Sequence, residues 1–120
     1  MSVKFLGLRT VVYPARDLEA AKLWWNSTLG HEPYFDEPFY VGYDVGGYEL
    51  ALDPDGDPGE GPIVYWGVDD VSDAEAQLLA AGCESRSSCR EVGSGIEVAV
   101  VRNPTGDLIG LIHNPHFQAA

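Results

Sequence analysis

The sequence predicts an α+β fold built from two copies of one βαβββ module. Two strand-to-helix segments resemble one another, strand-like runs ending in a hairpin follow each of them, and a turn-rich stretch separates the copies. One helix for several strands is typical of α+β proteins rather than of doubly wound α/β sheets. Module one is expected at about 4–54, the linker at 54–62 and module two at about 63–115, all within a single domain, 1–120.

In the first module, residues 12–21 pass from an apolar strand through an acidic turn into an alanine-rich helix. Asp17 is the expected N-cap, because its carboxylate can accept from free backbone N–H groups. Gly30 follows the last apolar position, where a left-handed C-cap is expected. One helical stripe collects the side chains that should face the core: Leu18, Ala21, Trp25 and Leu29.

Strands are expected at 39–45 and 48–53, and alternate residues of a strand point to opposite faces. In the second of these strands, Tyr48, Leu50 and Leu52 should pack under the helix. Glu49, Ala51 and Asp53 should then face water or a cavity. Tyr40 and Tyr43 cannot both face that cavity, and the sequence does not decide between them.

The second module repeats this pattern after a linker rich in Asp, Pro and Gly. A strand at 63–68 leads to a helix whose predicted start is the capping-box pair Ser72 and Glu75. Gly82 is the expected glycine at the end of this helix. The predicted helix face comprises Ala74, Leu78 and Ala81. A strand follows at 96–101, and in the last strand Ile109 and Leu111 take the helix side while Leu108, Gly110 and Ile112 lie opposite.

Composition and charge limit the kind of partner. The chain has 120 residues, of which 45% are hydrophobic and 22% charged, as in a folded globular protein. A net charge of −12 disfavours nucleic acid and anionic membranes as partners and favours neutral or cationic small ligands, although it also promotes solubility. No apolar run approaches the roughly 18 residues of a membrane span, and the N-terminus lacks a signal-peptide pattern. A cytoplasmic location is expected, with Cys83 and Cys89 as reduced thiols.

Three motifs make the sequence similar to the vicinal oxygen chelate superfamily, which includes glyoxalase I, extradiol dioxygenases and bleomycin-resistance proteins. The motifs are residues 13–21 with Trp24, Trp25, Leu29 and Gly30 behind them, residues 68–71, and residues 102–111. The resemblance covers about residues 4–115. It implies a curved mixed sheet around a cleft, and it implies a homodimer.

The resemblance also implies a divalent metal held by four strand positions, two on the first strands and two on the last strands of the modules. In this sequence the four positions hold Thr10, Ala51, Ile63 and Gly110. None of them offers the imidazole or carboxylate that such an ion needs. No metal and no other cofactor is therefore expected, and neither glyoxalase nor dioxygenase activity is expected.

Other residues offer further candidate donors or catalytic groups. His31, His113 and His116 lie outside the predicted cleft positions, so we expect ordinary surface or packing roles for them. Glu49 is the best candidate for a cleft carboxylate, and the alternative is a solvated surface charge. Asp53 fits a turn with Pro54 better than a ligand role. No nucleophile motif is present, so no catalytic residue is assigned.

Aromatic residues supply the remaining candidates. Trp25 and Trp66 are expected in helix–sheet packing, whereas Tyr65 shares a strand face with Ile63 and should point into the cleft. The predicted ligand-binding set is Thr10, Glu49, Ala51, Ile63, Tyr65, Gly110 and Ile112.

Three functions are compatible with the sequence. The preferred hypothesis is a metal-free protein that binds an aromatic or cationic small molecule. Rigid aromatic walls with few polar groups are typical of such binding sites. The alternative is a lyase or isomerase-type enzyme in which Glu49 acts as general base. A purely structural or protein-interaction module is the third.

Overall fold

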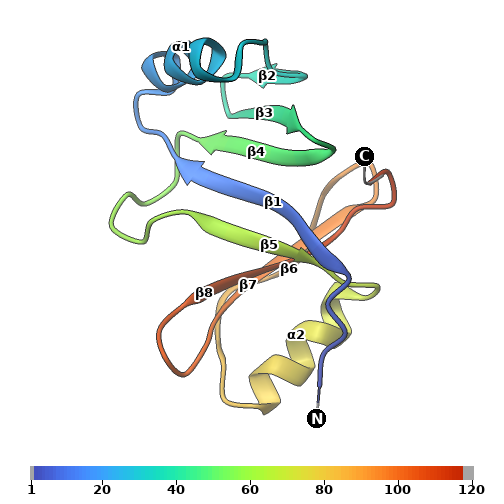
Figure 1. Cartoon of the computed structure of the whole chain (residues 1–120). Helices are drawn as coiled ribbons and strands as arrows, with labels where there is room; N and C mark the ends of the chain where they lie inside the picture. Colours follow the sequence, from blue (N-terminus) through green and yellow to red (C-terminus); the bar gives the residue numbers. More distant parts are fainter. Residues whose placement is uncertain (1, 118–120) are drawn as a thin grey trace. The chain divides into compact units, whose positions relative to one another are not determined.

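The computed structural model describes residues 2–117 of the chain. Within them the elements follow the predicted βαβββ order twice (Figure 1). The first module contains β1 (Gly7–Pro14), α1 (Leu18–Leu29), β2 (Phe35–Glu37), β3 (Tyr40–Val45) and β4 (Tyr48–Asp53). The second contains β5 (Ile63–Gly67), α2 (Val71–Ala80), β6 (Glu84–Gly93), β7 (Ile96–Arg102) and β8 (Leu108–His113). The predicted α+β class is confirmed.

The chain divides into two compact units, which are described separately. The first unit comprises residues 10–62. The second unit comprises residues 63–117 together with residues 2–9, so the start of β1 groups with the second module. Leu6 illustrates this, because its backbone N–H donates to the carbonyl oxygen of Gly67 at 2.8 Å.

In the first unit, the strands form a mixed sheet in the order β2-β3-β4-β1. Strands β1 and β4 are parallel, with Thr10 opposite Glu49, and the other pairs are antiparallel. Helix α1 packs on one face, over a core in which Val41, Tyr43 and Leu52 are almost fully buried. Side chains packed against this core include Leu18, Ala21, Trp25, Leu29 and Leu50, as the stripe and the strand alternation predicted. Tyr48, predicted on the same face at the start of β4, is instead 42% exposed.

Both predicted caps of α1 are confirmed. The side chain of Asp17 accepts from the backbone N–H of Ala20 at 3.1 Å, which satisfies one of the free donors of the first turn. Gly30 has φ 81°, and its N–H donates to the carbonyl of Asn26 at 2.9 Å. A positive φ is costly for a residue with a Cβ, so glycine ends this helix.

In the second unit, β5 pairs with β8 in parallel, and β8, β7 and β6 follow in antiparallel order. Helix α2 packs on a core formed by Val68, Val71, Ala74, Ala99 and Leu111. Ile109 packs against the same core, which confirms that Ile109 and Leu111 take the helix side of β8. Neither α1 nor α2, the helices of residues 2–117, has the length and apolar character that a bilayer crossing needs.

The predicted start of α2 is wrong. The N-cap is Asp70, whose Oδ1 accepts from the N–H of Asp73 at 3.0 Å, and not Ser72. Because Val71 is fully buried, the helix must begin there to bring this side chain into the core. Glu75 then cannot complete a capping box, and its Oε1 instead accepts from the N–H of Cys89 on β6 at 3.3 Å.

The far end of α2 and one tryptophan also differ in detail from expectation. Ala81 is an exposed C-cap and not a core residue, whereas Gly82 has the expected positive φ of 104°. Trp66 is 36% exposed, and its ring lies 5.9 Å from that of Phe5. Phe5 of the N-terminal segment is thus the packing partner of Trp66, where a partner from a helix was expected. Cys83 and Cys89 are free thiols, as predicted.

Candidate functional site

Strand alternation in the first unit separates a helix face from a polar face. Val41 and Tyr43 of β3 face α1, and the hydroxyl of Tyr43 donates to Oδ1 of Asn26 at 2.6 Å. Tyr40 therefore lies on the opposite face, together with Glu49 of the neighbouring strand. This decides the alternative that the sequence left open, since Tyr40 and not Tyr43 belongs with Glu49.

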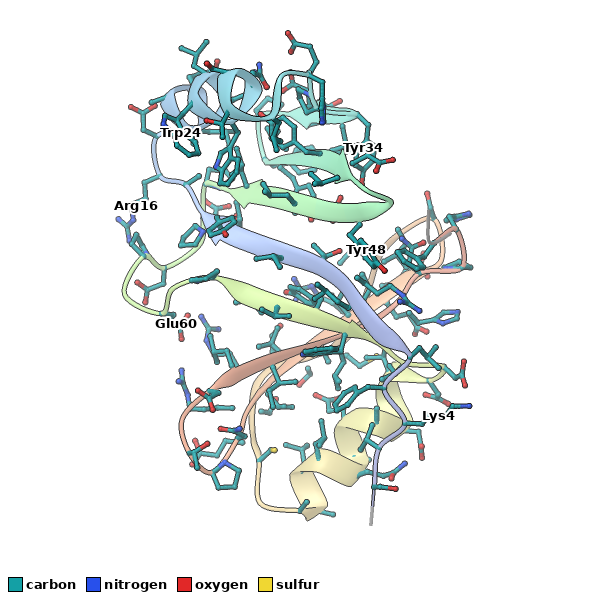
Figure 2. All side chains as sticks on the ribbon, in the orientation of Figure 1. Lys4, Arg16, Trp24, Tyr34, Tyr48 and Glu60 are labelled. Atoms are coloured by element: carbon teal, nitrogen blue, oxygen red, sulfur yellow. The ribbon has the colours of Figure 1, made fainter. Side chains whose placement is uncertain are left out.

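Three hydroxyl groups converge on the carboxylate of Glu49. Thr10 donates to Oε1 at 3.2 Å, and Tyr40 donates to the same oxygen at 2.8 Å. Tyr34, from the segment between α1 and β2, donates to Oε2; its side chain is labelled in Figure 2. We call Glu49, Thr10, Tyr34 and Tyr40 the hydroxyl cluster. All four belong to the first unit.

The backbone explains why these side chains can meet. Thr10 lies opposite Glu49 in the parallel register of β1 and β4 and is only 6% exposed, so its hydroxyl is fixed beside the carboxylate. Gly42 provides the remaining space. A Cβ at this position would lie 2.7 Å from Oε2 of Glu49 and 3.3 Å from Cε1 of Tyr34. The side chains of Glu49 and Tyr34 can lie against β3 because residue 42 is glycine.

Tyr34 is held as a hydrogen-bond donor. Burial of its hydroxyl end, then its hydrogen bond to Glu49, and then the charges of Glu49 and Asp44 raise its pKa well above the usual value. The residue as a whole is still 63% exposed, although its hydroxyl lies against the carboxylate. The phenol thus stays protonated at physiological pH and can donate to Glu49.

Negative charge is concentrated in the unit that carries this cluster. Residues 10–62 contain eleven of the nineteen acidic residues and two of the seven basic ones. Of the net charge of −12, a share of −9 belongs to this unit. The surroundings of Glu49 therefore favour the approach of cations over that of anions.

In the second unit, the structure brings together Tyr65 and Gly110. The two residues are partners in the register of β5 and β8. The ring of Tyr65 lies so close over the glycine that a Cβ on Gly110 would be 2.5 Å from its Cδ2. Ile63 is half-buried, and Ile112 is 8% exposed. Of the seven predicted ligand-binding residues, the structure thus joins Thr10 with Glu49 and Tyr65 with Gly110.

The four positions that the family resemblance links to a metal do not fit a divalent ion. The hydroxyl of Thr10 donates to Glu49, and Ala51 is fully buried and carries no donor atom. Ile63 is a hydrocarbon, and the ring of Tyr65 occupies the space that a side chain at position 110 would need. Among residues 2–117, no group of three or more His, Cys, Asp or Glu side chains could hold a metal ion.

The histidines lie outside the hydroxyl cluster. His31 is exposed, and its Nδ1 lies 3.1 Å from the carbonyl oxygen of Glu32. His113 is half-buried at the end of β8. Nε2 of His116 lies 2.9 Å from the carbonyl oxygen of Ser94.

Sequence reasoning missed Tyr34 and Gly42. Strand alternation could have found Gly42, because it shares a face with Tyr40 in the strand predicted at 39–45. Tyr34 precedes β2 in an irregular segment, where no periodicity indicates the direction of a side chain.

Comparisons with known proteins establish the fold. No protein-family model and no curated protein sequence matches the chain. Among solved structures, methylmalonyl-CoA epimerase in complex with methylmalonyl-CoA and NH4+ is similar at 17% identity and a TM-score of 0.74, over 98% of this chain and all of that one. A glyoxalase/bleomycin resistance protein/dioxygenase superfamily member from Vibrio splendidus 12B01 is similar at 19% identity and 0.67, over 88% and 97% of the two chains.

The Mn(II)-bound glyoxalase from Novosphingobium aromaticivorans is also similar, at 18% identity and a TM-score of 0.70. The match covers 93% of this chain but 40% of that larger protein. At these identities the likeness concerns the fold. The chain has the fold of the vicinal oxygen chelate superfamily, as the sequence motifs indicated.

Proposed function

We propose that this protein binds a small molecule without a metal ion, and that Glu49 accepts hydrogen bonds from an aromatic or cationic ligand. The observation that carries the proposal is the convergence of three hydroxyl donors on this one carboxylate. A hydroxyl that has donated its hydrogen to Glu49 can act toward a further group only as an acceptor. The cluster therefore suits a ligand that brings N–H donors.

Charge and aromatic character support the same ligand class. The excess of acidic residues in 10–62 raises the local concentration of cations. The hydroxyls of Tyr34 and Tyr40 contact the carboxylate, so two aromatic side chains lie beside it, and aromatic faces attract cations as well as flat apolar groups. A flat cation, such as an aromatic amidinium, combines both properties.

The structural neighbours are compatible with small-molecule binding. The epimerase is described with methylmalonyl-CoA and NH4+, and the glyoxalase is described as bound to Mn(II). Because one fold hosts many activities, these ligands do not transfer to this chain. The residues at the family's metal positions support a metal-free site here.

A general-base role for Glu49 has weaker support. Each carboxylate oxygen offers about two lone-pair positions, and Thr10 and Tyr40 occupy those of Oε1. The hydroxyl cluster is therefore better suited to hold a ligand than to remove a proton from one.

The test is isothermal titration calorimetry with benzamidine, a flat aromatic cation, and with benzamide as its neutral counterpart. Benzamidine should bind the metal-free wild-type protein more tightly than benzamide does. Glu49→Gln should weaken benzamidine binding about 10- to 100-fold, the range expected for losing a hydrogen bond to a charged group. Equal affinity of Glu49→Gln and wild type would contradict the proposal, and so would binding that requires a stoichiometric divalent ion.

A further inference from the structure

We propose that Tyr34 is a displaceable gate, and that its hydroxyl holds the position on Oε2 of Glu49 that an N–H group of the cationic ligand takes. This inference rests on the proposed function, because it concerns how the same carboxylate receives its ligand. It assigns to Tyr34 a role in admission and selection, which differs from the supporting role of Thr10 and Tyr40.

The three donors are held in different ways. Thr10 is buried in β1, and Tyr40 is half-buried at the first position of β3; both donate to Oε1. Tyr34 lies outside the strands and is 63% exposed. Tyr34 donates to the other oxygen, Oε2. This oxygen is thus covered by the donor with the least support from the sheet.

Tyr34 can move without unfolding its segment. Its backbone N–H donates to the carbonyl oxygen of Gly42 at 3.0 Å, which anchors the main chain beside β3. Rotation of the side chain therefore releases Oε2 while this backbone bond stays in place. Rotamer changes of exposed side chains take place within nanoseconds, so such a gate does not limit the rate of binding.

Gly42 forms the floor of the position that Tyr34 would vacate. Its backbone lies close to both Oε2 of Glu49 and Cε1 of Tyr34, because there is no Cβ between them. When the phenol swings away, a flat group can lie in its place against the glycine and donate to Oε2. The phenol ring is itself flat, so the position already fits an aromatic or amidinium plane.

Competition at Oε2 leads to selection by charge. The bond from Tyr34 is a neutral O–H donor to a carboxylate, and a ligand that takes the same lone-pair position must replace it with something stronger. An amidinium or ammonium N–H adds the attraction of opposite charges, whereas a neutral amide offers about what the phenol already offers. With the phenol in place, a cation therefore still gains when it replaces this bond, whereas a neutral molecule of the same shape gains almost nothing.

Removal of the phenol hydroxyl tests the gate directly. In calorimetry with benzamidine, Tyr34→Phe should bind about three- to tenfold more tightly than wild type, because no hydrogen bond has to be broken first. Benzamide should gain by a similar factor, because both ligands displace the same hydrogen bond. The control is Tyr43→Phe, which removes a hydroxyl on the opposite face, beside Asn26, and should leave both affinities unchanged.

The outcomes separate this inference from the proposed function. If benzamidine binds wild type but Tyr34→Phe binds it equally or more weakly, Tyr34 is a ligand contact or a bystander, and the gate is wrong while the proposed function stands. If neither wild type nor Tyr34→Phe binds benzamidine, the proposed function itself fails for aromatic cations, and the gate fails with it. Tighter binding by Tyr43→Phe would also contradict the gate, because the effect would not be specific to Oε2.

Discussion

Gly110→Ala should destabilise the protein through the ring of Tyr65. A Cβ on residue 110 would lie 2.5 Å from Cδ2 and 2.6 Å from Cγ of that ring. Non-bonded carbon atoms need about 3.5–4 Å. The ring would therefore have to move by about 1 Å. Cγ adjoins the Cβ of Tyr65, so rotation about the Cβ–Cγ bond cannot relieve the clash, and the side chain must leave its rotamer.

The size of the effect follows from two opposing contributions. Overpacking of this kind costs about 1–3 kcal/mol. Replacing a glycine inside a strand by alanine gains about 0.5–1 kcal/mol, because the unfolded chain has fewer conformations to lose. The free energy of unfolding should therefore fall by up to about 2.5 kcal/mol, with about 1 kcal/mol at the middle of the range, and the melting temperature by a few degrees.

Tyr65→Ala provides the matched background, because it removes the ring that the new methyl group would strike. In this background Gly110→Ala should be neutral or stabilising by up to about 1 kcal/mol, so the sign of the effect reverses. Urea unfolding of the four proteins of this cycle, followed by tryptophan fluorescence, measures the coupling between the two positions. An equal loss of stability in both backgrounds would refute the contact between Tyr65 and Gly110.

Three further predictions concern other contacts. Phe117→Ala should lower the free energy of unfolding in urea by about 1 kcal/mol, because the guanidinium of Arg9 lies 3.9 Å from the centre of its ring; unchanged stability would contradict this. Burial, and then the charges of nearby carboxylates, raise the pKa of the Cys89 thiol, so at pH 8 iodoacetamide should modify Cys83→Ser more slowly than Cys89→Ser; equal rates would argue against it. The pKa of Tyr34 is higher in the folded than in the unfolded protein, so its contribution to stability is complete below about pH 10 and is lost as the pH rises further. Absorbance titration near 295 nm should show one late-ionising tyrosine fewer in Tyr34→Phe than in wild type, and identical curves would contradict the raised pKa.

The sequence predicted the features that depend on local periodicity. The duplicated βαβββ order, the caps of α1, Leu50 and Leu52 of β4 and the helix-facing residues of β8 all follow from repeats and from strand alternation. These signals are strong because a one-residue error in a strand would turn every apolar side chain to the wrong face. The position of Glu49 on the polar face of β4 was predicted in the same way.

Features that depend on distant segments could not be predicted. Phe5 takes the place beside Trp66 because residues 2–9 pack with the second module, and no pattern within the N-terminal segment indicates this. Tyr34 reaches Glu49 from an irregular segment. Asp70 and Ser72 lie two residues apart and are both suitable N-cap residues, so the local sequence alone does not decide between them. The homodimer that the family resemblance implies stays a prediction, and sedimentation velocity would test it.

The most direct measurement of the central claim is the NMR signal of the Glu49 carboxylate itself. In protein labelled with ¹³C at glutamate Cδ, the Glu49 resonance is identified by its absence in Glu49→Gln. The hydroxyl cluster predicts that benzamidine shifts this resonance more than any other glutamate signal, and that benzamide moves it little. Saturation with benzamidine while the Glu49 signal stays in place would show that the ligand binds elsewhere, and the proposed site would be wrong.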